Sequence, residues 1–409
     1  MGRWSLLAMA GVVVACGAPS TPVVQLPQVA SATASSTVVS PPWRARWESC
    51  RRTAGPVRIS GADVAQSPQV VWDGHEALVT FETMPTGVRL VAVDPGAREV
   101  WHESLTGRGG AIAWNASSRV GLVMTSDAIG WLGPDGRPNG TPMSPPQATN
   151  IQFNRAAFAV EQGFVLVSGI GSRASSTVMP PLSYAIVTSS PGAVDWKEID
   201  PNGDRGLALG ATATTGSATW IVSPGHRSGG TLYPVEGLPG RSGAATGLAL
   251  SKRAAIDLAP LGDVRVVAVG EAGKDPVVII LDNGTYDLAA ARVHDGRVGA
   301  RQRLGASSHR SASAQWLRVG EALVVGADRI GDSPGVALAR LDLDSPNALG
   351  TALSIGERDS QQLRVSATGQ GFVAVWNIAD DGAPVMKMTG GQTMHALSTM
   401  LAVYDCSGG

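Results

Sequence analysis

Three cysteines carry the most distinctive chemistry in this sequence of 409 residues. A thiol can be acylated, oxidised to a disulfide or bound to a metal, and each use depends on its surroundings. Cys16 ends a short apolar segment at the amino terminus, whereas Cys50 and Cys406 stand near the two ends of the remaining chain. The positions therefore separate one candidate modification site from one candidate pair.

The residues before Cys16 have the features of an export signal. Arg3 supplies a positive charge, and the apolar stretch that follows, about nine residues long, is too short to span a membrane. The segment Val13-Val14-Ala15-Cys16 resembles the lipobox of bacterial lipoprotein signals. The resemblance implies removal of residues 1–15 and a diacylglycerol on Cys16, which with further acylation gives stable anchoring. An ordinary secretory signal with a chance cysteine is the alternative.

The residue after the lipidated cysteine bears on the address. In well-studied Gram-negative bacteria an Asp at this position favours the inner membrane, and this sequence has Gly17. The resemblance therefore points to an exported protein that is lipid-anchored at the outer membrane of the cell envelope.

Export to an oxidising compartment leaves Cys50 and Cys406 as an even pair, which favours a disulfide. The bridge would close a loop of about 355 residues, for which chain-entropy arguments give ~5 kcal/mol of stabilisation before strain. Two unrelated free thiols are the alternative. A bridge requires the two ends of the folded region to be neighbours, and a closed ring meets that requirement where an open solenoid does not.

Other candidate chemistry is only weakly indicated. Gly169-Ile-Gly171-Ser-Arg-Ala174 fits a loose dinucleotide fingerprint, but the continuation with two prolines predicts a hairpin loop. The acidic turns 282–284, 342–344 and 380–382 could bind Ca²⁺, although turn chemistry explains them equally well. The histidines lack the spacing of zinc ligands; they are His75, His102, His226, His294, His309 and His395. We therefore expect no catalytic, cofactor-binding or metal-binding residues.

The composition indicates many short strands. The 51 Gly and 26 Pro make about 19% of the chain, against a usual ~12%. Charged residues are 16% and the net charge is −1, where ~25% charged is typical. With 44% hydrophobic residues the chain is neither disordered nor a basic nucleic-acid binder. The arginine-rich stretch 44–52 is interpreted as a solvated surface segment.

A weak internal repeat predicts the fold. Units of strand, tight turn and strand recur about every 49 residues, and such a period is typical of propeller blades. Segments 70–81 and 365–376 resemble the Trp-Asp/Asn-Gly repeat of bacterial secreted β-propellers. We predict an all-β chain, a seven-bladed β-propeller of four-stranded blades, with six or eight blades as alternatives. The central strands of the units are placed at Leu78, Leu122, Val165, Trp220, Val266, Leu323 and Phe372.

Three segments follow from these patterns. Residues 1–15 are the signal peptide, residues 16–46 the lipidated cysteine with a Ser/Thr/Pro-rich tether, and residues 47–409 the propeller. Tryptophans such as Trp72, Trp114, Trp316 and Trp376 are expected to fill the space between blades, with sugar stacking as the alternative.

A lipid anchor joined to a propeller is similar in architecture to the propeller lipoprotein of the outer-membrane β-barrel assembly machinery. The expected function is a cell-envelope lipoprotein that binds or scaffolds through propeller loops. Its partners would be the membrane, through Cys16, and envelope proteins or polysaccharide, with no cofactor and no nucleic acid. A secreted propeller enzyme acting on polysaccharide, a glycosidase or lyase, is the alternative.

Overall fold

A computed structural model describes most of residues 46–408. The residues outside the description are 1–45, 62–64, 85–86, 145–154, 161–162, 170–181, 189, 193, 199–211, 216–217, 226–227, 237–248, 273–274, 307–313, 332, 346–347, 358, 380–385, 388–392, 395–396 and 409.

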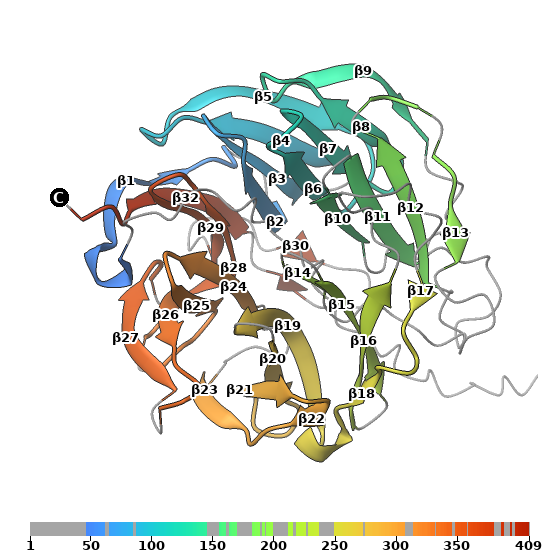
Figure 1. Cartoon of the computed structure of the whole chain (residues 1–409). Helices are drawn as coiled ribbons and strands as arrows, with labels where there is room; N and C mark the ends of the chain where they lie inside the picture. The colour runs from blue at the N-terminus through green and yellow to red at the C-terminus, as the bar shows by residue number, and fades with distance from the viewer. Residues whose placement is uncertain are drawn as a thin grey trace, which may run out of the picture.

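In the described part of the chain, seven antiparallel sheets of four or five strands stand around a common centre (Figure 1). The first sheet contains β2 (Ala65–Trp72), β3 (Ala77–Thr83), β4 (Val88–Val93) and β5 (Glu99–Leu105). The second contains β6 (Ala111–Asn115), β7 (Val120–Met124), β8 (Ile129–Leu132) and β9 (Pro138–Met143). The third contains β10 (Arg155–Val160), β11 (Gly163–Gly169), β12 (Leu182–Thr188) and β13 (Lys197–Glu198).

The next three sheets continue the ring. The fourth contains β14 (Thr212–Thr215), β15 (Ala218–Gly225), β16 (Ser228–Glu236), β17 (Ala249–Leu250) and β18 (Ile256–Asp257). The fifth contains β19 (Val264–Ala272), β20 (Asp275–Asp282), β21 (Asp287–His294), β22 (Arg297–Val298) and β23 (Gln302–Ala306). The sixth contains β24 (Ala314–Val319), β25 (Ala322–Ala327), β26 (Ala337–Leu341) and β27 (Leu349–Ser354). The two five-stranded sheets arise because their outer strand is split into two short pieces, which both pair with the third strand.

The last sheet, called the closing sheet below, takes strands from both ends of the chain. It has the order β1 (Arg51–Arg58), β32 (Leu397–Asp405), β29 (Gly371–Ala379) and β28 (Ser360–Ala367). A two-stranded hairpin of β30 (Met386–Lys387) and β31 (Thr393–Met394) lies between β29 and β32 in sequence, and two short 3-10 helices, η1 (Trp47–Ser49) and η2 (Ala259–Leu261), complete the described elements. The predicted all-β propeller, with its chain ends paired, is confirmed.

The tight turns follow from side chains that bond their own backbone. Asp73, Asn115 and Thr368 each accept hydrogen bonds from the backbone N–H groups two and three residues ahead. These residues therefore close the turns between β2 and β3, between β6 and β7, and between β28 and β29. In each sheet this turn joins the innermost strand to the next strand outward. In the turn between β2 and β3, Gly74 adopts φ +108°, a conformation that glycine tolerates best.

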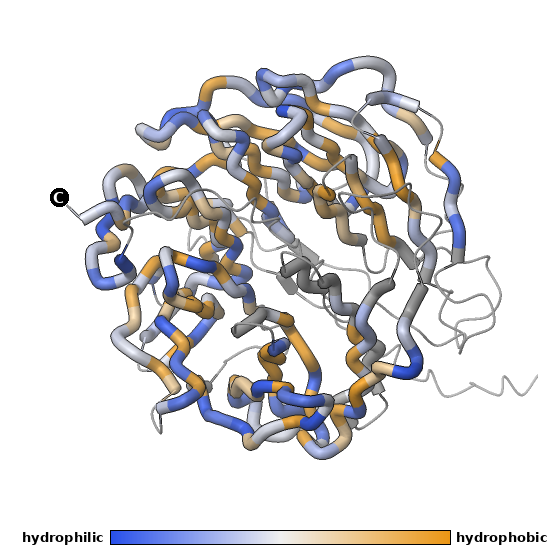
Figure 2. The backbone as a smooth tube through the Cα atoms, in the orientation of Figure 1, coloured by the Kyte–Doolittle hydropathy of each residue, from blue (hydrophilic) through white to orange (hydrophobic). Residues whose placement is uncertain are grey.

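The core lies between neighbouring sheets and not inside one layer. Figure 2 shows apolar residues along the strands of the ring. Leu78 and Leu90 pack against Ile112 and Leu132 of the next sheet, and all four are fully buried. Because both faces of most sheets are covered, their strands are nearly continuous apolar runs with few charges. The low charge content of the chain has this cause.

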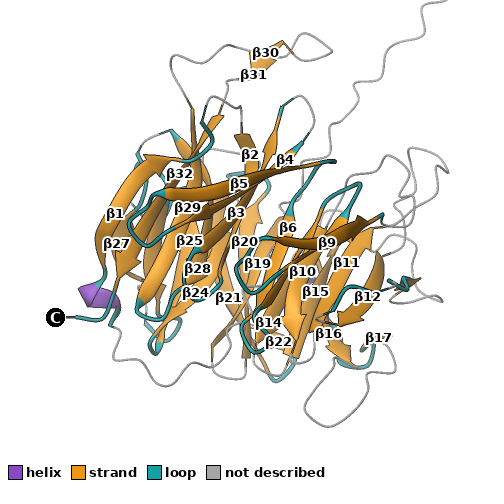
Figure 3. Cartoon of the chain, turned by 90° about the horizontal axis from the view of Figure 1, so that it is seen from above, coloured by secondary structure: helices purple, strands orange, loops and turns teal. Residues whose placement is uncertain are grey.

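The innermost strands of two neighbouring sheets, β2 and β28, run in the same direction. Ser67 near the start of β2 bonds Gln362 near the start of β28, and Trp72 at the end of β2 bonds Ser366 near the end of β28. We call the end of the ring where these inner strands begin the start face, and the opposite end the end face. Figure 3 shows β30 and β31 at one end and η1 with the carboxyl terminus at the other.

Candidate functional site

The first candidate site is the junction at which the ring closes. β1 is the outermost strand of the closing sheet, and its Arg51 pairs with Asp405 while its Val57 pairs with Leu401 of β32. Strand β32 is held on its other side by β29 over nine register pairs, from Gly371–Asp405 to Ala379–Leu397. The first strand of the folded chain therefore completes a sheet whose other members lie more than 300 residues later.

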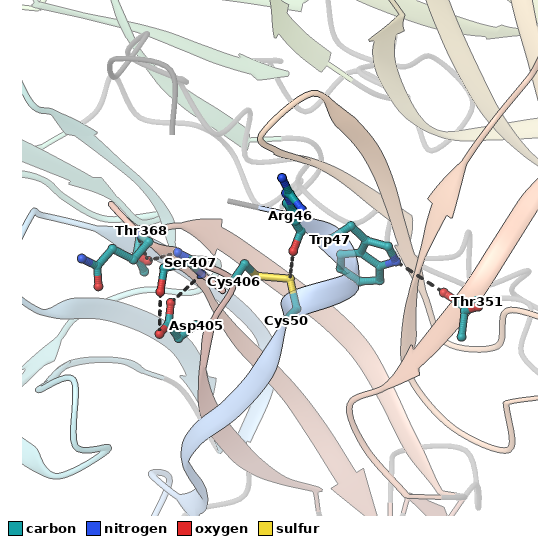
Figure 4. Close-up of a disulfide and its surroundings, with 10 residues drawn as sticks. Arg46, Trp47, Cys50, Thr351, Thr368, Asp405, Cys406 and Ser407 are labelled. Carbon is teal, nitrogen blue, oxygen red and sulfur yellow. Dashed lines mark hydrogen bonds between the residues drawn. A yellow bond between two sulfur atoms is a disulfide. The ribbon is translucent and has the colours of Figure 1, made fainter. Parts of the chain in front are cut away.

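A disulfide joins Cys50 to Cys406 at this junction, with a sequence separation of 356 (Figure 4). The backbone N–H of Arg46 donates to the carbonyl oxygen of Cys406 at 3.0 Å, and the N–H of Cys406 donates to Gln370 at 2.8 Å. Cys406 is fully buried and Cys50 is half-buried. The pairing expected from the two cysteines is present, and it lies at the end face because Asp405 and Gly371 mark that end of the sheet.

Trp47 of η1 anchors the same segment in the core. Its indole is 7% exposed, stacks on Phe372 with ring centroids 6.5 Å apart, and donates from Nε1 to the carbonyl oxygen of Thr351 in β27 at 3.4 Å. Phe372 in turn stacks on Tyr404 at 4.6 Å, and burial raises the pKa of Tyr404 to about 12. The aromatic column joins the closing sheet to sheet β24–β27.

The second candidate site is a group of buried and half-buried polar side chains on and around the inner strand β28. Gln315 Oε1 accepts from the N–H of Val365 at 2.7 Å, and Asp328 Oδ1 accepts from the N–H of Gln362 at 2.8 Å. Gln362 Oε1 accepts from Ser67 at 3.1 Å and from Asn377 Nδ2 at 2.8 Å. Side chains of sheet β24–β27 thus accept from backbone N–H groups of β28, which would otherwise lack partners. On the other side, the backbone N–H groups of Ser67 and Trp72 in β2 donate to side chains of β28.

Arg364 is the most unusual member of this group. It is 3% exposed, and its guanidinium donates from Nη1 to the carbonyl oxygen of Leu363 at 2.9 Å, whereas Nε has no hydrogen-bond partner. Burial lowers the pKa of Arg364 to about 10, and the charge of Asp328 opposes that shift. A buried cation of this kind can favour a unique packing arrangement at a cost in stability.

The remaining candidate residues from the sequence either lie outside the described residues or lie apart from one another. Cys16, the tether up to residue 45 and the glycine-rich segment 170–174 lie outside the described residues. His102 bonds Glu99 at 2.6 Å, and His294 bonds Asp275 at 2.7 Å and lies 3.4 Å from Asp295; both histidines are exposed. His75 lies exposed in a turn, and the other three histidines are outside the description.

The acidic turns are engaged locally. Asp282 Oδ1 accepts from the backbone N–H groups of Thr285 and Gly284, which with Arg301 lower the pKa of Asp282. Asp344 forms a bidentate pair with Arg292, while residues 380–382 are not described. Among the described residues no group of three or more His, Cys, Asp or Glu side chains could hold a metal ion. None of the helices in that part of the chain could span a membrane.

The tryptophans expected to pack between blades do so where they are described. Trp114 lies in the core between sheets β2–β5 and β6–β9, and Trp376 lies between the closing sheet and sheet β24–β27. Trp316 packs against the core shared by β19–β23 and β24–β27, and Trp72 packs beside the core on the other side of the closing sheet.

Sequence reasoning missed Trp47, Gln362 and Arg364. A tryptophan three residues before a cysteine expected to be bridged is a signal for Trp47, since a bridge demands local order on both sides. The run Gln361-Gln362-Leu363-Arg364 places polar residues in a strand of a chain with few charges, and such a break in pattern is a signal for a buried network.

Comparisons with known proteins add little to this geometry. No family model matches the chain, and no curated protein matches it. Solved structures that resemble it include the Dos1 propeller (9% identity, TM-score 0.49, covering 83% of this chain and 78% of that one) and the N-terminal domain of Nup159 (9%, 0.46, 88% and 95%). A post-proline cleaving enzyme from Rickettsia typhi matches at 9% identity and TM-score 0.41 over 78% of this chain and 50% of that one. The sheets of this chain itself therefore carry the assignment to the β-propellers, and its function has to be argued from its own residues.

Proposed function

We propose that the protein is a cell-envelope lipoprotein, held at the outer membrane by a lipid on Cys16, and that it binds or scaffolds envelope proteins through its start face. The observation that carries the proposal is the position of the ring closure. Arg46, Cys50 and Cys406 lie together at the end face, so the chain from Cys16 reaches the ring there. The start face is then directed away from the point of attachment.

A closed ring suits this role because it presents loops on a rigid support. Turns between second and third strands gather at the start face, among them the segments after Met124, Asp282 and Ala327. Charges of both signs lie in or beside these turns. Asp127 is exposed in the turn after β7, Arg108 is exposed in the connection from β5 to β6, and Asp282 pairs with Arg301. With a net charge of −1 the chain has little long-range electrostatic steering. Recognition would depend on local loop chemistry.

Site-specific crosslinking in cells tests the proposal. A photoreactive residue replaces Asp127 at the start face or, as a matched acidic control, Asp295 in the turn after β21 at the end face; both are exposed. We expect a discrete protein adduct from position 127 and none from position 295. Equal adducts from both positions, or none from either, contradict the proposed face. A carbohydrate adduct at 127 favours the polysaccharide reading instead.

The anchor has a separate test. Substitution of Cys16→Ala in the full chain is expected to move the protein from the membrane fraction to the soluble fraction and to abolish labelling with a fatty-acid analogue. Retention of both in the variant overturns the lipid assignment without affecting the proposed binding face.

A further inference from the structure

Residues 46–50, called the N-terminal clamp below, hold the chain to two sheets at once. Arg46 bonds Cys406 and Cys50 is bridged to it, so both attach to the closing sheet. Trp47 bonds Thr351 of β27, and Glu48 lies 3.1 Å from Arg340 of β26. The clamp therefore spans the seam between the closing sheet and sheet β24–β27, before the first strand begins.

The strand that follows the clamp is weakly held on its own. β1 pairs on one side only, with five register pairs to β32, and its ladder is interrupted between Arg52 and Ala54 and between Ala54 and Val57. It is an edge strand, exposed along most of its length. A force applied at its amino-terminal end would open its pairs one after another, since each is stressed in turn.

The disulfide occupies the one position that prevents this opening. Cys50 immediately precedes Arg51, the first residue of β1, and Cys406 immediately follows Asp405, the partner of Arg51. Once the contacts of residues 46–48 give way, tension arriving from the amino-terminal side reaches Cys50 before β1 and passes through the sulfur–sulfur bond to Cys406. From there it acts on β32, which lies inside the sheet and is held by nine register pairs to β29 and by the bond from Cys406 to Gln370.

We propose that the N-terminal clamp is a mechanical bypass, which carries a pulling force from the amino-terminal segment past β1 into an interior strand of the closing sheet. Its use in the cell rests on the proposed lipid anchor, because an anchored protein that binds a partner at its opposite face is pulled between those two points. The bypass itself depends only on the folded ring.

Single-molecule stretching of the full chain tests the bypass. One handle is attached at the amino terminus of a Cys16→Ser chain, and the other at an azide-bearing residue in place of Ser118, which is exposed in the turn between β6 and β7. The comparison is with Cys50→Ser, because Cys50 is half-buried whereas Cys406 is packed in the core and is left unchanged.

We expect Cys50→Ser to show an early low-force step that releases the clamp and β1. This step frees residues 46–64, roughly 19 residues at about 3.5 Å each, or about 65 Å of contour length. The disulfide-bonded chain is expected to lack that step. The same early step in both chains overturns the proposal, as does its absence from Cys50→Ser.

A third chain separates the bridge from simple packing. Trp47→Ala with the disulfide intact removes the aromatic anchor but leaves the bypass, so it is expected to show no early step. If Trp47→Ala began to unfold at the low force of the early step in Cys50→Ser, the indole, and not the bridge, would be what resists the force, and the proposal would be overturned.

Hydrogen exchange gives a second readout that needs no force. In Cys50→Ser the amides of β1 are expected to exchange faster than in the bridged chain, and those of β29 to keep their rate. Circular dichroism checks that the variant is folded. Unchanged exchange along β1 in a folded Cys50→Ser chain contradicts the weak pairing on which the bypass depends. Because Cys16 plays no part in these experiments, failure of the lipid assignment leaves their outcome unaffected.

Discussion

The backbone N–H of Ser67 donates to the side-chain oxygen of Gln362 at 3.1 Å, and both residues adopt a positive φ, +50° and +58°. Each is the third residue of an inner strand, β2 or β28, and in each strand the pairing register shifts at that point. The two bulges therefore lie side by side, and one carboxamide connects them. The seam between the first sheet and the closing sheet is aligned by this contact as well as by apolar packing.

Replacement of Gln362→Met should reveal how much this contact contributes. The change keeps side-chain length but leaves the N–H of Ser67 and the Nδ2 of the fully buried Asn377 without their acceptor. We expect a loss of about 2–4 kcal/mol in the free energy of unfolding, measured with urea, since each unsatisfied buried donor costs ~1–3 kcal/mol. Gln361→Met is the matched control, because in the described structure its half-buried side chain makes no hydrogen bond. Equal losses in the two variants would contradict the role of Gln362.

Gly371 and Gly369 should respond oppositely to alanine. A Cβ at position 371 would overlap the carbonyl oxygen of Tyr404, which belongs to the backbone of β32 and cannot move aside. A Cβ at position 369, in the same turn, meets nothing within 4 Å. Gly371→Ala is expected to destabilise the protein by about 3 kcal/mol and Gly369→Ala by less than about 0.5 kcal/mol, as read from thermal unfolding. A tolerated Gly371→Ala would mean that β29 and β32 are further apart than described.

Periodic features of this fold could be predicted from the sequence, and contacts between distant single residues could not. The repeat of apolar strands and turn residues such as Asp73 predicts the sheets because local chemistry determines them. The pairing of Cys50 with Cys406 follows from counting thiols. Trp47 carries no periodic signal, because its partners Thr351 and Phe372 are defined only once the ring has closed.

We expect Trp47 to contribute strongly to the free energy of unfolding, and its neighbour Glu48 to contribute little. Trp47→Ala removes a buried indole and leaves a cavity between two sheets, for which ~3–5 kcal/mol is typical. Glu48→Ala breaks an ion pair with Arg340 whose side chains are 66% and 49% exposed, so the effect should stay below about 1 kcal/mol. Urea unfolding followed by tryptophan fluorescence of the remaining residues compares the two. A small loss in Trp47→Ala would show that the clamp is not part of the core.

His294 should titrate above its ordinary pKa of 6.5. The hydrogen bond to Asp275 raises the pKa of His294 most, and the charges of Asp275 and Asp295 add to the shift. A raised pKa in the folded state means that the protonated ring contributes stability at low pH, which is lost as the pH rises through the folded pKa. Because the ring is exposed, we expect the shift to be visible in an NMR titration of its protons. Asp275→Asn should bring the pKa back towards 6.5, and an unchanged value would exclude the pair.

Arg364 and Asp328 offer a test of whether a buried charge pair stabilises the ring. They are 3% and 2% exposed, and the charge of Asp328 favours the charged form of Arg364, which burial opposes. Arg364→Met leaves the Asp328 carboxylate in the interior without that cation, and Asp328→Asn leaves the cation without the carboxylate while keeping an Oδ1 acceptor for Gln362. Each single change is expected to cost about 3 kcal/mol.

The double variant decides between two roles for this pair. In the first role, each charge chiefly offsets the cost of burying the other. The double variant Arg364→Met with Asp328→Asn should then lose less free energy of unfolding than either single variant, because neutral side chains of similar size avoid the desolvation that a buried ion requires. If each side chain holds the inner strand through separate contacts, the two losses should add. A double-mutant cycle in urea measures the difference, and additive losses would mean that Arg364 positions β28 independently of Asp328.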